Sequence, residues 1–131
     1  MKTALVTGGS RGIGKAIAIQ LGNYFHVVVG YASSEEKAND VVKEITTAGG
    51  SASTVHIDIS NNESVDKAFT LIEKDYKSVD VLINNAGVTK DNILPRMKED
   101  EWSDVIQTNL TGGFYTSKRA IKLMMKNKWG R

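Results

Sequence analysis

The sequence alternates short apolar runs with longer helical patterns, and this alternation limits the possible folds more than any other feature. Four runs have the length and the Val, Ile and Leu content of strands, and they are Ala4–Val6, His26–Val29, Ser53–Ile57 and Val79–Ile83. Strands that alternate with helices pair in parallel, because each helix returns the chain to the same edge of the sheet. The pattern therefore predicts an α/β fold, a doubly wound parallel sheet with helices on both faces.

Helical stripes occupy the segments between these runs. Apolar residues recur at a spacing near 3.6 within Ile13–Tyr24, Ala38–Ala48, Val65–Tyr76 and a long stretch from about Glu99 to about Lys126. Capping boxes are predicted at two helix starts, Ser33 with Glu36 and Ser60 with Glu63. Gly112-Gly113 interrupts the long helix at a cost of about 1 kcal/mol per glycine relative to alanine. Either a close-packed neighbour or a bend would explain the two glycines.

Composition limits the class of protein. The chain has 131 residues, of which 40% are hydrophobic and 24% charged, and this suits one globular domain. The formal charge of +2 and the absence of a basic patch argue against nucleic acid. There is no Cys, which excludes disulfides and Cys-ligated metal and is compatible with a reducing cytoplasm. No apolar run approaches the ~20 residues of a membrane span. The N-terminus does not resemble a signal peptide, so a cytoplasmic location is expected.

A glycine-rich segment follows the first predicted strand and opens the first helix. Its residues are Thr7, Gly8, Gly9, Ser10, Arg11, Gly12, Ile13 and Gly14. Glycines allow a tight turn, and a helix N-terminus presents N–H groups and a positive dipole to a phosphate. The segment is therefore predicted to hold the pyrophosphate of a dinucleotide, although a simple turn would have the same composition. Its spacing, Gly-x-x-x-Gly-x-Gly, differs from the commoner Gly-x-Gly-x-x-Gly.

The end of the second predicted strand bears on the type of dinucleotide. NAD-selective sites usually place an Asp or Glu there to hold the ribose 2′-OH, and none stands at the tip of this strand. Arg11 could instead contact a 2′-phosphate, and the Ser33 hydroxyl could do so in competition with its capping role. This pattern favours NADP(H) over NAD(H). Alternatively, Arg11 is only a solvated loop cation.

Polar residues also follow the third and fourth predicted strands, at the sheet edge where ligands bind in this architecture. Asp58 could accept a hydrogen bond from an adenine amino group, or it could be a turn residue. Asn85 could bridge two strand ends or face a coenzyme. Asn109 lies on the apolar stripe of the long helix, where an unpaired amide is costly, and it could equally be a packing amide that is satisfied. His26 and His56 lie within strands and are interpreted as packing residues, and no metal-ligand cluster is present.

Taken together, these motifs resemble the short-chain dehydrogenase/reductase family over the whole chain. The cofactor loop, the adenine-contact position, the Asn-Asn-Ala-Gly motif and the catalytic Asn of that family are matched, in order, by Thr7–Gly14, Asp58, Asn84–Gly87 and Asn109. The finer pattern is similar to the 3-oxoacyl-[acyl-carrier-protein] reductases of type II fatty acid synthesis. Segments with this finer similarity are Thr7–Ala18, Asn85–Asn92, Arg96–Lys98, Glu101-Trp102 and Thr108–Leu110.

The resemblance implies a single Rossmann-type NAD(P)-binding domain over residues 1–131. It implies that NADPH reduces a 3-oxoacyl group on acyl-carrier-protein to the (3R)-3-hydroxyacyl form. Coenzyme contacts are implied for Gly8, Gly9, Ser10, Arg11, Gly12, Ile13, Gly14, Ser33, Asp58, Ile59, Asn85, Ala86 and Gly87. Asn109 is implied as a catalytic residue that anchors a water in the proton relay. A homo-tetramer is expected for full-length members, and no nucleic acid, membrane or metal partner is expected.

The chain also departs from the family pattern. Members are about twice as long as these 131 residues. They form a seven-stranded sheet and add a Ser on strand five and a Tyr-x-x-x-Lys on the next helix. No Tyr of this sequence is followed four residues later by Lys. The expectation is a truncated domain of about four strands and four helices, inactive alone, since a proton donor contributes typically 10²–10⁴-fold. A non-catalytic NADP(H)-binding module and a helix-mediated partner of a full-length reductase are the alternatives.

Overall fold

A computed structural model describes all residues from Met1 to Arg131. Its four strands form one parallel sheet in the order β3-β2-β1-β4. The strands are β1 (Thr3–Val6), β2 (His26–Tyr31), β3 (Ser51–His56) and β4 (Val81–Ile83). The α-helices are α1 (Gly12–Leu21), α2 (Glu35–Thr47), α3 (Asn62–Tyr76), α4 (Glu99–Val105) and α5 (Gly112–Asn127), with a 3-10 turn η1 (Leu94–Arg96) and a π-helical segment η2 (Ile106–Thr111).

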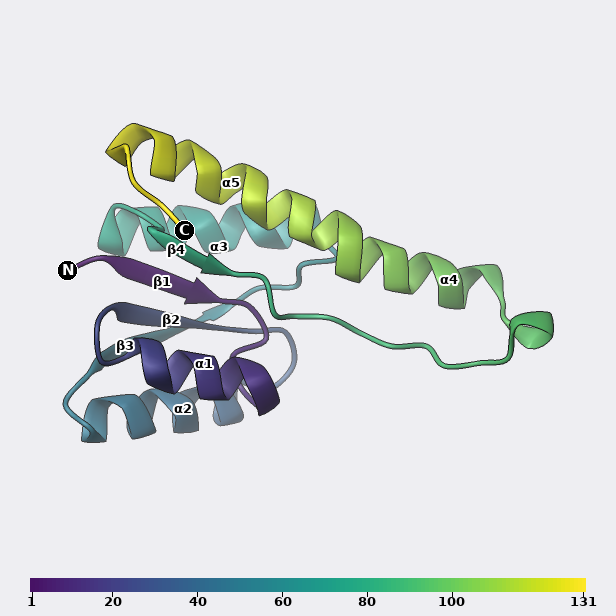
Figure 1. The fold of residues 1–131 in the computed structure, drawn as a ribbon, viewed down its shortest axis with the longest axis horizontal. Helices are drawn as coiled ribbons and strands as arrows, with labels where there is room; N and C mark the ends of the chain where they lie inside the picture. Colours follow the sequence, from purple (N-terminus) through teal and green to yellow (C-terminus); the bar gives the residue numbers. More distant parts are fainter.

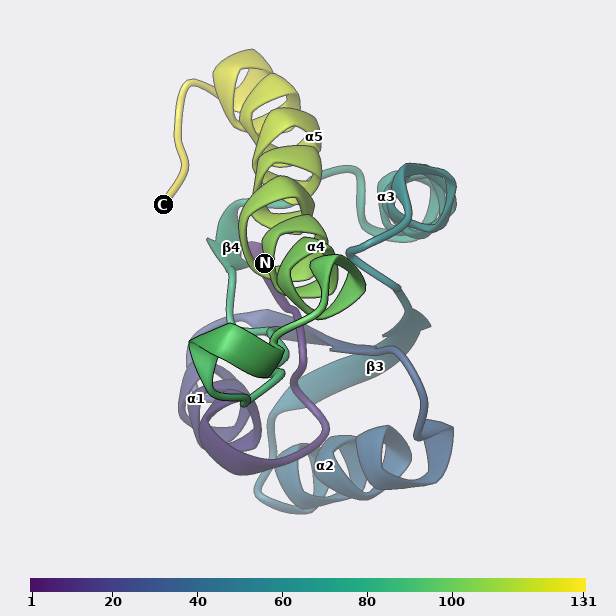
Figure 2. The ribbon, with the colours of Figure 1, turned by 90° about the vertical axis from the view of Figure 1, so that its right-hand side faces the viewer.

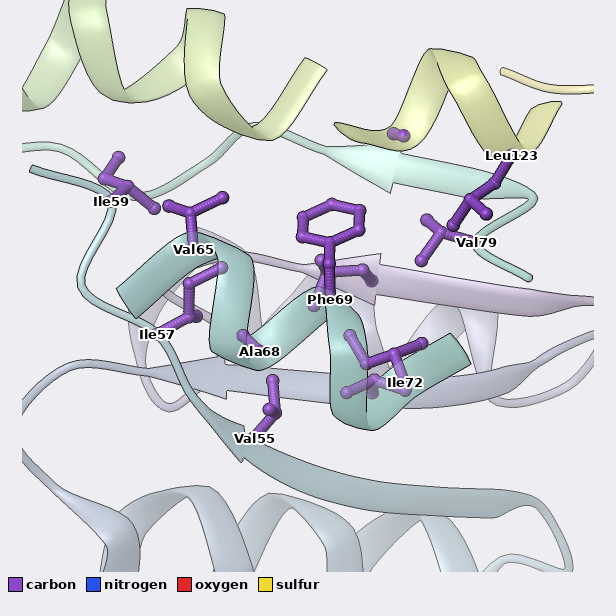
Figure 3. Packing of buried hydrophobic residues seen from close by; sticks show 12 residues of the cluster. Val55, Ile57, Ile59, Val65, Ala68, Phe69, Ile72, Val79 and Leu123 are labelled. Atoms are coloured by element: carbon purple, nitrogen blue, oxygen red, sulfur yellow. The ribbon is translucent and has the colours of Figure 1, made fainter. Parts of the chain in front are cut away.

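The helices cover both faces of the sheet, so the predicted doubly wound α/β architecture is confirmed. Figures 1 and 2 show α1 and α2 on one face and α3 and α5 on the other. Successive strand residues point to opposite faces, and accordingly Leu5 belongs to the cluster under α3 and α5 whereas Val6 belongs to the cluster under α1 and α2. Figure 3 shows Phe69 pointing from α3 towards α5, in the larger of the two clusters.

β4 lies at the edge of the sheet, and it is shorter than the expected Val79–Ile83. The side chain of Asp80 accepts a hydrogen bond from the Thr3 N–H at 2.8 Å. Since the carboxylate takes this donor, the regular pairing with β1 begins only at Val81. The outer side of β4 is partly covered by the end of the chain, where Arg131 N–H donates to Asp80 O and Leu82 N–H donates to Arg131 O (Figure 1).

Both predicted capping boxes are wrong by one residue. The N-cap of α2 is Ser34, whose hydroxyl accepts from the Lys37 N–H at 3.3 Å. The N-cap of α3 is Asn61, whose side chain accepts from two main-chain N–H groups of the first turn. In each case the next residue also carries a side chain suited to capping, and local pattern does not distinguish such neighbours. The hydroxyl of Ser33 is thereby free of a capping role.

The long helix forms over the predicted range, and its one irregularity is the π-helical segment η2. α4, η2 and α5 follow one another without a break, and Figure 1 shows α4 extending past the end of the sheet. A Cβ at Gly112 would lie 2.6 Å from the carbonyl oxygen of Ile59, whereas a Cβ at Gly113 would meet nothing within 4 Å. Of the two explanations for this pair, close packing therefore applies to Gly112. None of the helices combines the length and apolarity that crossing a membrane requires.

His26 is the first residue of β2 and lies opposite Ser51 of β3, so it tests the packing there. Its ring stacks on Tyr76 with centroids 4.2 Å apart, and its nitrogens lie 2.7 and 3.1 Å from the Ser51 and Ser53 hydroxyls. Burial lowers the pKa of His26 from its ordinary value of 6.5. The unfolded chain therefore binds this proton at a higher pH than the folded chain does.

The free energy of unfolding is expected to fall as the pH drops from 6.5 towards the lower pKa of folded His26, and this contribution is fully present above 6.5. Urea denaturation between about pH 8 and about pH 5 measures the effect. His26→Asn is the control, because it removes the titrating ring. An equal loss of stability in both proteins would show that other groups cause it.

Candidate functional site

The glycine-rich loop connects β1 to α1 in a conformation that depends on its glycines. Gly8 and Gly12 have positive φ angles of 63° and 56°, which residues with a side chain rarely adopt. A Cβ at Gly14 would overlap the carbonyl oxygen of Gly8 and the amide of Asn85. Gly9 donates its N–H to Gly30 O at 2.9 Å and is buried against β2. No side chain caps the first turn of α1. The N–H groups at the N-terminal end of α1 therefore have no side-chain partner.

A cavity of about 520 Å³ lies beside this loop. It brings together the β1–α1 loop, the start of the β2–α2 segment and the residues after β4. Nine of the predicted site residues line it, and they are Gly8, Ser10, Arg11, Gly12, Ile13, Ser33, Asn85, Ala86 and Gly87. Five lining residues were not predicted from the sequence, and they are Tyr31, Ala32, Ser34, Lys37 and Val88. The parallel sheet places all three segments at the carboxyl ends of β1, β2 and β4.

The other predicted site residues lie outside this lining. Gly9 is buried in the loop, and Gly14 is buried in the first turn of α1. Asp58 accepts hydrogen bonds from the N–H and the hydroxyl of Ser60 through one carboxylate oxygen, at 3.0 and 2.7 Å. Ile59 is 6% exposed and belongs to the core cluster under α3 and α5. Its side chain is therefore committed to packing.

Thr7 and Asn85 tie the end of β1 to the end of β4. The Thr7 hydroxyl donates to Ile83 O at 3.2 Å and accepts from the N–H groups of Asn85 and Ala86, both at 3.1 Å. The Asn85 amide donates to the carbonyl oxygens of Thr7 and Gly8 at 3.1 and 3.0 Å. Of the two roles considered for Asn85, the structure thus shows the bridge between strand ends, and the same residue lines the cavity.

Asn109 lies in the π-helical segment η2 and holds the loop after β4. Its amide oxygen accepts from the Val88 N–H at 2.8 Å, and its amide nitrogen donates to Val88 O at 2.9 Å. It lines a second cavity of about 480 Å³ that adjoins the first and shares Arg11, Gly87 and Val88 with it. Gln107 of the same segment donates to Ser60 O at 2.9 Å. Asn109 is therefore an amide satisfied by the loop backbone, positioned next to the first cavity.

Comparisons with known proteins agree with this arrangement. A profile of the short chain dehydrogenase family matches residues 2–131. The 3-oxoacyl-[acyl-carrier-protein] reductase FabG of Staphylococcus epidermidis is 45% identical over 130 residues, which make up 98% of this chain and 53% of that protein. The FabG of Pseudomonas aeruginosa is 42% identical over 130 residues, 99% of this chain and 53% of that protein. The chain thus spans about half the length of the curated relatives it matches.

A solved structure shows the same fold at high similarity. The crystal structure of a metagenomic short-chain oxidoreductase in complex with NADP superposes with a TM-score of 0.93 and 37% sequence identity, over 98% of this chain and 59% of that one. The sequence motifs, the parallel sheet and the matched profile all lead to one assignment. The chain belongs to the short-chain dehydrogenase family of oxidoreductases.

Proposed function

We propose that this chain is the coenzyme-binding part of an NADPH-dependent reductase that converts 3-oxoacyl-[acyl-carrier-protein] to the (3R)-3-hydroxyacyl form in type II fatty acid biosynthesis. The observation that carries the coenzyme proposal is the cavity at the carboxyl ends of β1, β2 and β4, which is lined by the glycine-rich loop. The relatives at 41–45% identity, all named for that reaction, support the substrate.

The residues present suit a dinucleotide. Gly8 and Gly12 adopt positive φ angles that allow a tight turn, and Gly14 leaves no space for a side chain against the loop. The uncapped first turn of α1 offers N–H groups and the positive end of the helix dipole. We propose that the loop and this turn hold the pyrophosphate, and that Asp58 and the main chain of Ile59 contact the adenine.

The roles of this chain in the reaction follow from the same geometry. When bound, NADPH supplies the hydride. Asn85 keeps the ends of β1 and β4 together, and Asn109 fixes Val88 in the loop that borders both cavities. We propose that Asn109 thereby orders the side of the site where the proton relay runs. The 131 residues contain no Tyr followed four residues later by Lys. Tested alone, they are therefore expected to bind the coenzyme without reducing 3-oxoacyl thioesters.

Arg11 gives a direct test of the preference for NADPH. It lines the coenzyme cavity, and none of the ion pairs in the chain includes it. Arg11→Gln is expected to weaken NADPH binding by about tenfold and to change NADH binding little, since a hydrogen bond to a charged group contributes about 1.5–3 kcal/mol. Titration of the purified chain, followed by nucleotide fluorescence, measures both dissociation constants. Absence of saturable binding to the unsubstituted chain at millimolar NADPH would refute the proposed function.

A further inference from the structure

We propose that Gln107 is a positioning residue for the adenine end of the coenzyme, because it holds the β3–α3 loop in which Asp58 lies. The inference rests on the proposed coenzyme site and adds to it a residue that lines neither of the two cavities. Gln107 belongs to the π-helical segment η2, two residues before Asn109. The β3–α3 loop covers residues 57–61, between the end of β3 and the start of α3.

The Gln107 side chain is held by two partners. Its amide nitrogen donates to the main-chain oxygen of Ser60 at 2.9 Å, across 47 positions of the sequence. The same nitrogen lies 3.5 Å from the Tyr115 hydroxyl of α5. Each of the two amide hydrogens therefore has an acceptor, and the half-buried side chain is fixed between the long helix and the loop.

Ser60 connects Gln107 to Asp58. The N–H and the hydroxyl of Ser60 both donate to Oδ1 of Asp58, at 3.0 and 2.7 Å. No hydrogen bond or ion pair within the chain uses Oδ2 of Asp58. A free carboxylate oxygen of this kind can accept the N–H of an adenine amino group. The series of contacts from Gln107 through Ser60 therefore sets the direction in which that oxygen points.

A π-helical hydrogen bond explains why Gln107 faces this loop. The Gly112 N–H donates to Gln107 O, the i→i+5 bond of a π-helix, which places the two residues one above the other. In an α-helix, residues five apart are rotated by about 140° around the axis. Gly112 lies against the main chain of Ile59, where a Cβ would come within 2.6 Å of the carbonyl oxygen. Two stacked residues of the long helix thus contact the consecutive loop residues Ile59 and Ser60.

Asn109 of the same segment holds the other side of the coenzyme cavity. It bonds to the N–H and the carbonyl oxygen of Val88, which lines that cavity. The segment η2 therefore contacts two loops, the one after β3 through Gln107 and the one after β4 through Asn109. A substitution at Gln107 should weaken the contacts with adenine, whereas one at Asn109 should weaken those at the nicotinamide end.

The test compares Gln107→Met with Gln20→Met. Gln107→Met retains the length of the side chain and removes the donor, and Gln20 is an exposed glutamine of α1 that lines neither cavity. Calorimetric titration measures the dissociation constants of NADPH and of adenosine 2′,5′-bisphosphate, which contains the adenine end without the nicotinamide. Gln107→Met is expected to weaken both ligands by the same factor, roughly three- to tenfold, as for loss of one hydrogen bond. Gln20→Met should leave both constants unchanged, and Asn109→Leu should weaken NADPH alone.

A second substitution, Asp58→Ala, shows whether Gln107 acts through the carboxylate. Without that carboxylate, adding Gln107→Met should change the NADPH dissociation constant by less than about twofold. Circular dichroism and urea denaturation establish that each variant folds. If Gln107→Met does not fold, Gln107→Glu takes its place, since an ionised carboxylate also cannot donate to Ser60 O.

The outcomes separate this inference from the proposed function. Unchanged NADPH affinity in the Gln107 variant would refute the inference and leave the coenzyme site in place. Weakening of NADPH without weakening of the bisphosphate would also refute it, because Gln107 would then act at the nicotinamide end. An undiminished effect together with Asp58→Ala would show a general structural role instead. If the unsubstituted chain binds neither ligand, the proposed function fails as well.

Discussion

Replacing Gly14 by Ala is expected to weaken NADPH binding by roughly 10- to 100-fold, in line with the 1–3 kcal/mol that overpacking a close contact typically costs. The added Cβ would overlap the Gly8 carbonyl oxygen and the Asn85 amide. The first is main chain of the loop proposed to hold the pyrophosphate, and the second bonds the ends of β1 and β4 together. Gly8 and Asn85 both line the cavity, so relief of the overlap shifts residues of the lining, and binding and stability should fall together.

Ala16→Ser serves as the matched control for Gly14→Ala. Ala16 lies two residues further along α1 and is exposed, so the change adds one atom to the same helix without a close contact. Its NADPH dissociation constant and its urea midpoint should match those of the unsubstituted chain. Unchanged NADPH affinity in Gly14→Ala would contradict the proposed position of the pyrophosphate.

Replacing Phe69 by Ala is expected to lower the free energy of unfolding by about 3–5 kcal/mol, the usual cost of removing a buried ring. Phe69 is 0% exposed and lies in the cluster between the sheet, α3 and α5 (Figure 3). The Arg119 guanidinium lies 5.6 Å from its ring centre and also pairs with Asp66 and Glu73. Loss of the ring therefore removes both apolar packing and the cation–π contact with Arg119.

Urea denaturation followed by circular dichroism measures the effect of Phe69→Ala. Leu71→Ala is the control, because Leu71 is on the same helix but 53% exposed, and its effect should stay within about 0.5 kcal/mol. Equal destabilisation by the two substitutions would mean that α3 is not held by the described core. Both variants introduce alanine into α3, so the difference between them reports the loss of packing rather than a change in helix propensity.

The elements of the fold could be predicted from the sequence because apolar residues are spaced differently in helices and in strands. The apolar runs at Ala4–Val6 and His26–Val29 and the 3.6-residue stripes place β1, β2 and the helices close to their observed bounds. Their boundaries were less accessible. Ser33 and Ser34 both have side chains that can cap α2, and only the observed backbone distinguishes them.

The candidate site could be predicted from the sequence in part. Glycine spacing from Gly8 to Gly14 indicates a phosphate loop because a turn of that kind restricts residue type locally. Lys37 gave no such signal, since a lysine in the first turn of a helix is usually a solvated charge. Its relation to Arg11 depends on how β1 and β2 pair, and pairing joins residues that are distant in the chain.

The sequence by itself determined that this chain forms a parallel α/β sheet with a glycine loop after the first strand, because both properties are encoded in residues that are neighbours along the chain. Only the tertiary structure decided which residues meet: Asn109 with the main chain of Val88, Gly112 with the carbonyl oxygen of Ile59, and Lys37 with Arg11 in the lining of one cavity. Those meetings depend on strand register and on the distance between packed layers. Both are set by the whole core rather than by any local segment.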